Sequence, residues 1–521
     1  MRKLVRRFSN ATSIDGCRSR PVSARSMGSG VVLLLLVGLL AVPVHSALAD
    51  ATPYQKPSAD ITAVIDAPLT PSTMVDPTRK WLLLLERPSL PGIEELAEPE
   101  LRLAGMRLSP QTNGPSRRRP SSGMQLIRMA DDELRDVKGL PENPRIDDEE
   151  WSDDGSKLLF TNTTSDGIEL WILDSEKAEV KRLVGPDVSM TANVAPRWID
   201  ESNIVFLRVP PDRGPAPEAP RVPTGPVIQE NLGQKAPAAT YQDLLASPSD
   251  EDLFDHYLTT QVTLVNLKGA LRPIGPSDVY WEVRPAPGGR YLLVQRLHRP
   301  YSYLVRAGRF PVRTEIWTTE AERVRELYDS PLQEQIPIAS GSVQTGPRSF
   351  EWRDDAPATV MWTEALDGGD AAAEAEYRDQ LYTLEAPFEG RPRPLVKLTL
   401  RYGGITWGSG RLALVNSWEW KTRRQMTQII QPGQPELDPV VLFDRSWEDR
   451  YNDPGSPITR VNEMGRPVLM TAQDDHTIFL SGIGASPEGN RPFLDRLDLE
   501  TRQTERLFRS EAPYYERVIT L

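Results

Sequence analysis

Short apolar runs bounded by Asp, Gly, Pro or Asn recur along most of the chain. Runs of this length, with few helix-spaced segments between them, predict β-strands and an all-β fold. The clearest runs are Trp81–Leu85, Lys157–Phe160, Ile168–Leu173, Asn203–Leu207, Gln261–Val265, Tyr291–Val294, Thr359–Trp362, Gln380–Leu384, Leu412–Val415 and Thr477–Leu480.

A degenerate repeat runs through this pattern. One unit consists of an anchor residue, an acidic or Pro/Gly turn and an apolar strand, as in Trp151–Phe160, with echoes at Met74–Leu82, Trp198–Phe206, Arg284–Val294 and Trp352–Val360. The turn residues favour hairpins, and a spacing of roughly 45 to 85 residues suits four-stranded blades with insertions. We therefore predict a β-propeller at 75–521 with seven blades, while six or eight remain possible.

A proline-rich excursion at Pro210–Leu245 interrupts the repeat. We expect it to be a long surface loop, since connections of this composition lie on the surface. A functional loop and a merely solvated insertion are equally consistent with the pattern.

The N-terminus has the pattern of an export signal. Seven basic residues and one acidic residue in Met1–Arg25 precede the apolar run Val31–Leu40 and the small-residue site Ala47–Ala49. We predict a signal peptide at 1–49, an arm at 50–74, and a periplasmic or extracellular protein. An uncleaved anchor, which would add membrane attachment, and a twin-arginine route through Arg6 and Arg7 stay open.

Charge and cysteine content narrow the function classes. The net charge of −12 becomes about −18 once the basic leader is removed, which argues against nucleic acid or anionic lipid as partners. The one cysteine, Cys17, lies in the leader. The mature chain therefore has no disulfide and must depend on a large apolar core.

Several longer stretches carry a resemblance to a known family. The turns resemble those of propellers in the prolyl oligopeptidase (S9) family, and longer stretches are similar to the propeller of glutamyl endopeptidases. These stretches are Trp81–Pro91, Thr240–Leu245, Arg299–Tyr303 with Arg309–Pro311, Trp352–Asp370 and Asp449–Gly455. The resemblance implies a two-part serine peptidase, in which a propeller screens access to an α/β-hydrolase domain that cleaves after acidic residues.

The chain departs from that family pattern in one respect. It contains no Gly-x-Ser-x-Gly, the turn on which an α/β-hydrolase holds its nucleophile. We therefore expect the α/β-hydrolase domain to be absent and the chain, as a truncated form, not to be catalytic by itself.

Other candidate chemistry is sparse. His256, His298 and His476 are far apart in the sequence, so we predict no metal site and no cofactor. The acidic runs Asp147–Glu150 and Ser249–Asp252 lack calcium-loop spacing and are predicted to be solvated turns.

The most suggestive local feature is a basic-aromatic stretch in an acidic chain. Guanidinium groups bind carboxylates through paired hydrogen bonds, and indole faces add apolar area. We predict a binding site for acidic side chains of peptides, although pairing of these arginines with local Asp and Glu is the competing interpretation. The candidate residues are Trp418, Trp420, Arg423 and Arg424, with Arg353 and Arg450 from the family-like stretches.

The predicted function is the substrate-gating propeller of an exported S9-type peptidase, with peptides and a separate hydrolase domain as partners. A stand-alone exported propeller that binds peptides or proteins is the alternative. A catalytic propeller of the glycosidase or lyase kind would need convergent carboxylates or a metal set, for which we find no pattern.

Overall fold

The structure is a computed structural model that describes residues 56–218, 241–473 and 476–521. The chain divides into two compact units, Met1–Ala67 and Pro68–Leu521. The described part of the first unit contains helix α1 (Ala59–Ile65). All strands of the described residues lie in the second unit.

Four-stranded antiparallel sheets make up most of Pro68–Leu521, and each runs up and down from its first strand to its fourth. Sheet 1 consists of β1 (Leu69–Val75), β2 (Trp81–Arg87), β6 (Gly123–Arg128) and β7 (Glu133–Asp136). Sheet 5 consists of β20 (Arg348–Trp352), β21 (Thr359–Ala365), β22 (Asp379–Glu385) and β23 (Arg393–Leu398), and sheet 6 of β24 (Arg401–Ser409), β25 (Leu412–Glu419), β26 (Arg424–Ile430) and β27 (Val440–Ser446). Sheet 7 consists of β28 (Ser456–Pro457), β31 (Thr477–Gly482), β34 (Phe493–Asp498) and β35 (Thr504–Arg509).

Sheets 2, 3 and 4 are joined edge to edge into one twelve-stranded sheet. The joins are narrow: Val188 pairs with Arg208 between sheets 2 and 3, and only Thr259 and Thr260 pair across from sheet 3 to sheet 4. Sheet 2 consists of β8 (Ile146–Trp151), β9 (Lys157–Thr164), β10 (Gly167–Asp174) and β11 (Glu179–Val188), and sheet 3 of β12 (Arg197–Asp200), β13 (Asn203–Arg208), β14 (Thr259–Asn266) and β15 (Leu271–Pro273). Sheet 4 consists of β16 (Asp278–Pro285), β17 (Tyr291–Leu297), β18 (Val312–Thr318) and β19 (Arg323–Ser330).

The first turn of sheet 2 shows why the repeat folds as it does. Ser152 Oγ accepts a hydrogen bond from the Lys157 amide at 2.9 Å and donates one to Asp154 Oδ1 at 2.7 Å. Gly155 adopts φ +67°, a conformation that glycine reaches without a steric penalty. These polar residues close the hairpin and leave the flanking strands free to enter the core.

The up-and-down order gives each sheet two ends. The turn between its first and second strands lies at one end, on what we call the first-turn face. The turn between its second and third strands lies at the other end, the second-turn face, with the links between sheets, the start of β1 and the end of β35. Neighbouring first turns touch, since the Gly288 amide of sheet 4 donates to the Pro357 carbonyl of sheet 5 at 2.8 Å.

The second-turn connections carry most of the remaining structure. They share an apolar cluster of their own, in which Phe254 packs against Tyr301 with ring centroids 4.8 Å apart. The additional elements are α2 (Ile93–Ala97), β3 (Leu101–Leu103), β4 (Met106–Ser109), β5 (Gly114–Pro115), α3 (Pro248–Leu258), the 3-10 helix η2 (Ala307–Arg309), and β32 (Ala485–Ser486) with β33 (Gly489–Asn490). One more hairpin, β29 (Thr459–Val461) with β30 (Pro467–Leu469), lies within the first turn of sheet 7.

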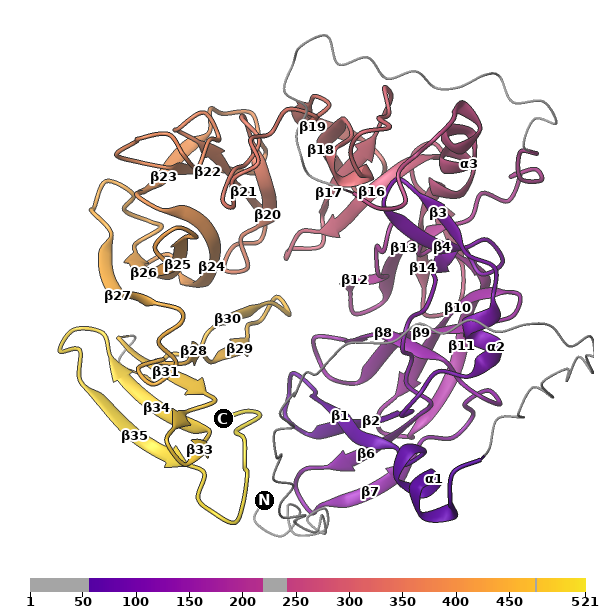
Figure 1. Ribbon diagram of the computed structural model, residues 1–521, viewed down its shortest axis with the longest axis horizontal. Coiled ribbons are helices and arrows are strands. Elements are labelled where there is room, and N and C mark those ends of the chain that lie inside the picture. The colour runs from indigo at the N-terminus through magenta and orange to yellow at the C-terminus, as the bar shows by residue number, and fades with distance from the viewer. Residues whose placement is uncertain (1–55, 219–240, 474–475) are drawn as a thin grey trace, which may run out of the picture. The chain divides into compact units, whose positions relative to one another are not determined.

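The core lies between consecutive sheets, which follow one another around a centre (Figure 1). One cluster joins Leu83 of sheet 1 to Phe160 of sheet 2, and similar clusters join each later pair up to sheets 6 and 7. Among the described residues no such cluster joins sheet 7 to sheet 1. The architecture is mostly β and is a β-propeller, as the sequence predicted.

The leader lies outside the described residues, and β1 begins at Leu69, within the segment predicted as an arm. The proline-rich excursion is described only at 210–218 and 241–245, and α3 follows it. The described residues include neither α/β-hydrolase elements nor a helix long and apolar enough to cross a membrane.

Candidate functional site

The basic-aromatic stretch forms the second turn of sheet 6. Trp418 and Arg424 lie on the paired strands β25 and β26, and Trp420 and Arg423 lie on or beside the tight turn between them. The antiparallel register brings the two strands together and places this turn on the second-turn face.

Three tryptophans gather at this turn. The ring of Trp447 lies 6.4 Å from that of Trp418 and 5.9 Å from that of Trp420 between centroids. The guanidinium of Arg423 stacks over Trp420 at 4.0 Å from the ring centroid, and 49% of Trp420 is exposed. Trp447 is not among the predicted residues because it lies on the link from sheet 6 to sheet 7, outside the basic-aromatic run.

The arginines of this turn are engaged within the chain. Arg424 forms two hydrogen bonds with Asp444, at 2.7 and 2.6 Å, and these hold the pKa of the Asp444 carboxyl below its usual value. Arg423 Nε lies 3.3 Å from Glu448 Oε1. The turn therefore presents indole surface, with Arg423 and Arg424 already paired. The nearby cavity, lined by Trp418 and Trp420, is about 40 Å³, room for little more than water.

Arg353 and Arg450 lie apart from this cluster. Arg353 belongs to the first turn of sheet 5, where it bonds Asp355 at 3.0 and 2.8 Å and stacks over Trp407 at 4.6 Å. Arg450 is exposed on the link between sheets 6 and 7, and no described contact ties it to the tryptophans. The structure thus places the six predicted residues on opposite faces.

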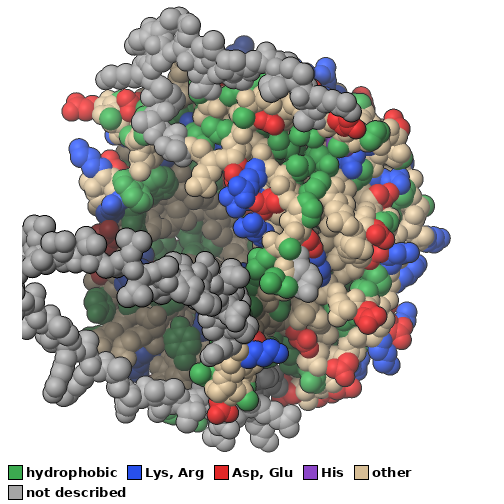
Figure 2. Space-filling view, turned by 45° about the vertical axis from the view of Figure 1, so that its right-hand side comes forward, with side chains coloured by type: hydrophobic (Ala, Val, Ile, Leu, Met, Phe, Trp, Pro, Cys, Tyr) green, Lys and Arg blue, Asp and Glu red, His purple; other side chains and the backbone are tan. Residues whose placement is uncertain are grey.

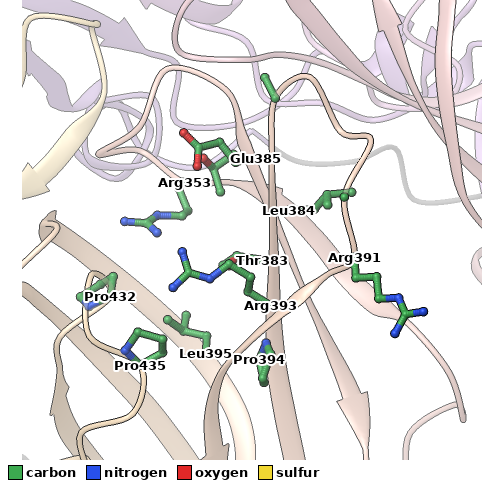
Figure 3. A pocket seen from close by; sticks show the side chains of 13 residues that line it. Arg353, Thr383, Leu384, Glu385, Arg391, Arg393, Pro394, Leu395, Pro432 and Pro435 are labelled. Atoms are coloured by element: carbon green, nitrogen blue, oxygen red, sulfur yellow. The ribbon is translucent and has the colours of Figure 1, made fainter.

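A larger pocket lies between sheets 5 and 6 on the first-turn face and includes Arg353 (Figure 3). Its volume is about 280 Å³, and Leu395, Pro432 and Pro435 form apolar walls. The guanidinium groups of Arg353 and Arg393 point toward the same space, whereas Arg391 points away from it (Figure 3).

Arg393 differs from the predicted arginines in its bonding. No hydrogen bond or ion pair within the described ranges engages its side chain, which is exposed at the pocket edge, whereas Asp355 holds Arg353 in place. One fixed and one available guanidinium beside apolar walls suit a carboxylate on a short aliphatic stem. Sequence reasoning missed Arg393 because its neighbours in the pocket come from other turns.

The histidines have ordinary partners. His298 Nε2 lies 2.7 Å from Asp329 Oδ1, and His476 Nε2 lies 3.6 Å from Asp498 Oδ2. His256 packs against Tyr257, and burial lowers its pKa. In the part of the chain that the structure describes, no group of three His, Cys, Asp or Glu is arranged to hold a metal.

The two acidic runs do not form the solvated turns that were predicted. Asp147–Glu150 lies within β8, where Asp148 bonds Arg118 at 2.6 Å. Ser249–Asp252 opens helix α3, because Ser247 and Asp250 form a capping box. The spacing of Ser247 and Asp250 was the available signal for that helix, and proline at the first position strengthens it.

Comparisons with known proteins identify relatives of about twice this length. The chain is 42% identical over 487 residues to "Probable glutamyl endopeptidase, chloroplastic" of Oryza sativa subsp. japonica, covering 90% of this chain and 52% of the relative. It is 39% identical over 493 residues to the protein of the same name from Arabidopsis thaliana, covering 91% and 51%. The chain thus spans about half the length of the curated relatives it matches. No family model matches it.

Solved structures show only a distant likeness. The acylaminoacyl peptidase of Pyrococcus horikoshii in an orthorhombic crystal form gives a TM-score of 0.39 at 8% identity, over 85% of this chain and 52% of that one. An acylaminoacyl peptidase in complex with Z-Gly-Gly-Phe-chloromethyl ketone gives 0.38 at 11%, over 70% and 46%. Values this low carry no argument about function.

Proposed function

Because the chain is homologous to the plant glutamyl endopeptidases over nine tenths of its length, we propose that it is the substrate-gating propeller of an exported peptidase of that kind. The observation that carries the proposal is this identity, which covers about half of the relatives' length. The propeller would admit peptides and exclude folded proteins, and hydrolysis would be performed by an α/β-hydrolase domain. Each of sheets 1 to 7 would be one blade, which makes the ring seven-bladed.

The second-turn face supports docking of such a domain. Large apolar side chains remain exposed on its connections, whereas on the connections of the opposite face only Leu437 and Val461 do so among the described residues. Figure 2 shows hydrophobic side chains exposed between charged ones on one side of the molecule. Both ends of the propeller, at Leu69 and Arg509, also lie on this face. The exposed side chains are Leu90, Ile93, Leu96, Leu304, Ile338, Leu366, Trp420, Tyr451, Ile483, Tyr514, Tyr515 and Ile519.

The test of the proposed function is active-site labelling. A fluorophosphonate probe will leave the purified 521-residue chain unlabelled. In source cells, an antibody against this chain will detect a labelled protein well above its 58.3 kDa. An unlabelled native protein of the mature size would refute the peptidase and leave the stand-alone binding propeller, which the Arg353 and Arg393 pocket favours.

Export remains part of the proposal, and it rests on the basic and apolar segments of the leader. The relatives are named chloroplastic, which describes those proteins. Edman sequencing of the native protein tests the proposal: a mature terminus near residue 50 supports it, and an intact Met1 contradicts it.

A hydrophobic dye will bind the isolated chain through the second-turn face. The variant L90S/I93S/L96S will lose about a quarter of the dye fluorescence, because it removes three of the twelve exposed apolar side chains on this face. The matched control removes three exposed leucines from outer strands, L134S/L271S/L507S. Equal losses in the two variants would mean that the apolar side chains do not act as a patch.

An acidic peptide will bind the pocket between sheets 5 and 6. R393A will weaken binding of a Glu-containing peptide about tenfold in calorimetry, since a charge-assisted bond contributes roughly 1.5 kcal/mol or more. The control is R391A, which changes the net charge equally but removes a side chain directed away from the pocket (Figure 3). If both variants bind equally well, the peptide binds elsewhere.

A further inference from the structure

The first turn of sheet 7 differs in length from the other first turns. In sheet 2, five residues separate β8 from β9, whereas residues 458–476 separate β28 from β31. Hairpin β29–β30 occupies this connection, and hydrogen bonds from Ile458 to the Phe479 carbonyl and from Met470 to the Ile458 carbonyl fix its base. The extra length therefore forms an ordered arm that projects from sheet 7.

The tip of this arm, residues 462–466, is held in shape by Asn462. Its side-chain oxygen accepts hydrogen bonds from the amides of Met464 and Arg466 at 3.0 and 2.9 Å. Gly465, at φ +70°, completes the turn. A tip closed in this way can hold a defined position at a distance from its own sheet.

The tip reaches the first turns of other sheets. Asn462 Nδ2 donates to the Asp354 carbonyl of sheet 5 at 2.8 Å, and Arg466 Nη2 donates to the Pro285 carbonyl of sheet 4 at 2.8 Å. A Cβ on Gly465 would lie 2.2 Å from Asp153 Cγ of sheet 2, so the two residues are in contact. The hairpin thus links sheet 7 to sheets 2, 4 and 5, which lie on several sides of the centre.

The tip carries a positive charge, and the residues around it carry negative charges. The positive charge of Arg466 acts to lower the pKa values of Glu150, Asp153 and Asp354, opposing the larger effect of burial. These carboxyl groups come from sheets 2 and 5. At the base of the arm, Leu469 packs against Gly408 of sheet 6, where β30 contacts β24.

We infer that hairpin β29–β30 is a strap across the first-turn face, which covers that mouth of the central channel and ties sheet 7 to sheets 2, 4 and 5. Propeller blades surround a channel, so an arm that contacts first turns around the ring must cross its opening. The strap also links sheet 7 to the start of the ring, where no described core cluster joins sheets 7 and 1. Peptides would then reach the channel from the second-turn face or between sheets 7 and 1.

The strap would tie the ring together whether or not a hydrolase domain is attached. Its test can use the absence of cysteine from the mature chain, with Cys17 replaced by serine where the leader is kept. Since the Gly465 Cβ position lies 2.2 Å from Asp153 Cγ, the two Cβ atoms are at most about 3.7 Å apart, within reach of a disulfide. D153C/G465C will crosslink under mild oxidation, and the control D153C/E500C, with its second cysteine on another turn of sheet 7, will stay reduced.

Coverage of the mouth is measured with a reporter thiol. In a chain with D354C, maleimide labelling will speed up about tenfold when the tip 462–466 is replaced by Gly-Gly, because the covering segment is gone. R466A, a milder change, will speed labelling less, and an E500C reporter will be unaffected. Equal D354C labelling rates with and without the tip, or failure of D153C/G465C to crosslink, would overturn the strap.

Discussion

D379A will lower the free energy of unfolding by about 4 kcal/mol, the largest loss we expect from any single charge removed. The Asp379 side chain is fully buried and accepts hydrogen bonds from Arg401 Nη1 at 2.6 Å, Arg348 Nη2 at 2.7 Å and the Tyr402 amide at 2.6 Å. Alanine would leave two nearly buried guanidinium groups without this carboxylate, and an uncompensated buried charge is costly. Urea denaturation followed by tryptophan fluorescence measures the change.

The matched control is D329A. Asp329 also joins two cationic side chains, Arg313 and His298, but its side chain is 34% exposed. Water can replace its bonds, so the loss should stay below about 1 kcal/mol. A D379A loss as small as this one would mean that Asp367, which also bonds Arg401, holds the network alone.

Local patterns were enough to predict the strands and the architecture. Trp81–Leu85 lies within β2, where Trp81, Leu83 and Leu85 are buried in alternation, and Ile168–Leu173 lies within β10. Apolar runs and turn residues report on neighbours in the sequence, and a propeller is built largely from such neighbours. Its repeated hairpins are therefore visible in the sequence.

Contacts between turns of different sheets were not predictable in the same way. Local sequence patterns do not place Asn462 against Asp354 or Arg393 beside Arg353, because each pair meets only after the sheets have packed. The predicted arginines show the same limit. The guanidinium of Arg424 is suited to binding an anion, but it already forms hydrogen bonds with Asp444. That contact depends on the pairing of β26 with β27.

Thermal stability will be highest near pH 5 and will fall toward pH 7.5. Burial raises the pKa of Asp147 and that of Asp354 to about 6 each. A carboxyl whose pKa is raised by folding stabilises the fold at pH values below its ordinary pKa. That contribution is lost as pH rises through 6. Carboxyls whose pKa values are lowered by folding, such as Glu169 and Asp367, have the opposite effect. They stabilise the fold at neutral pH, and this contribution is lost below about pH 4.

The groups around the two carboxyls set the size of this effect. Glu149 and Asp148 raise the pKa of Asp147 further, while Arg118 and Arg145 oppose them. Around Asp354 the acidic neighbours are Glu351 and Asp355, and the basic ones are Arg466 and Arg284.

D147N and D354N test the pH dependence, because asparagine resembles the protonated acid. With partial exposure, the two shifts together contribute about 3 kcal/mol, or about 3 °C in melting temperature for a propeller of this size. Calorimetry should show both variants melting higher than the parent at pH 7.5 and with less change down to pH 5. The control is D132N at an exposed turn, which should follow the parent. A parent chain that melts at the same temperature at pH 5 and 7.5 would show that these carboxyls ionise in the folded protein as readily as in water.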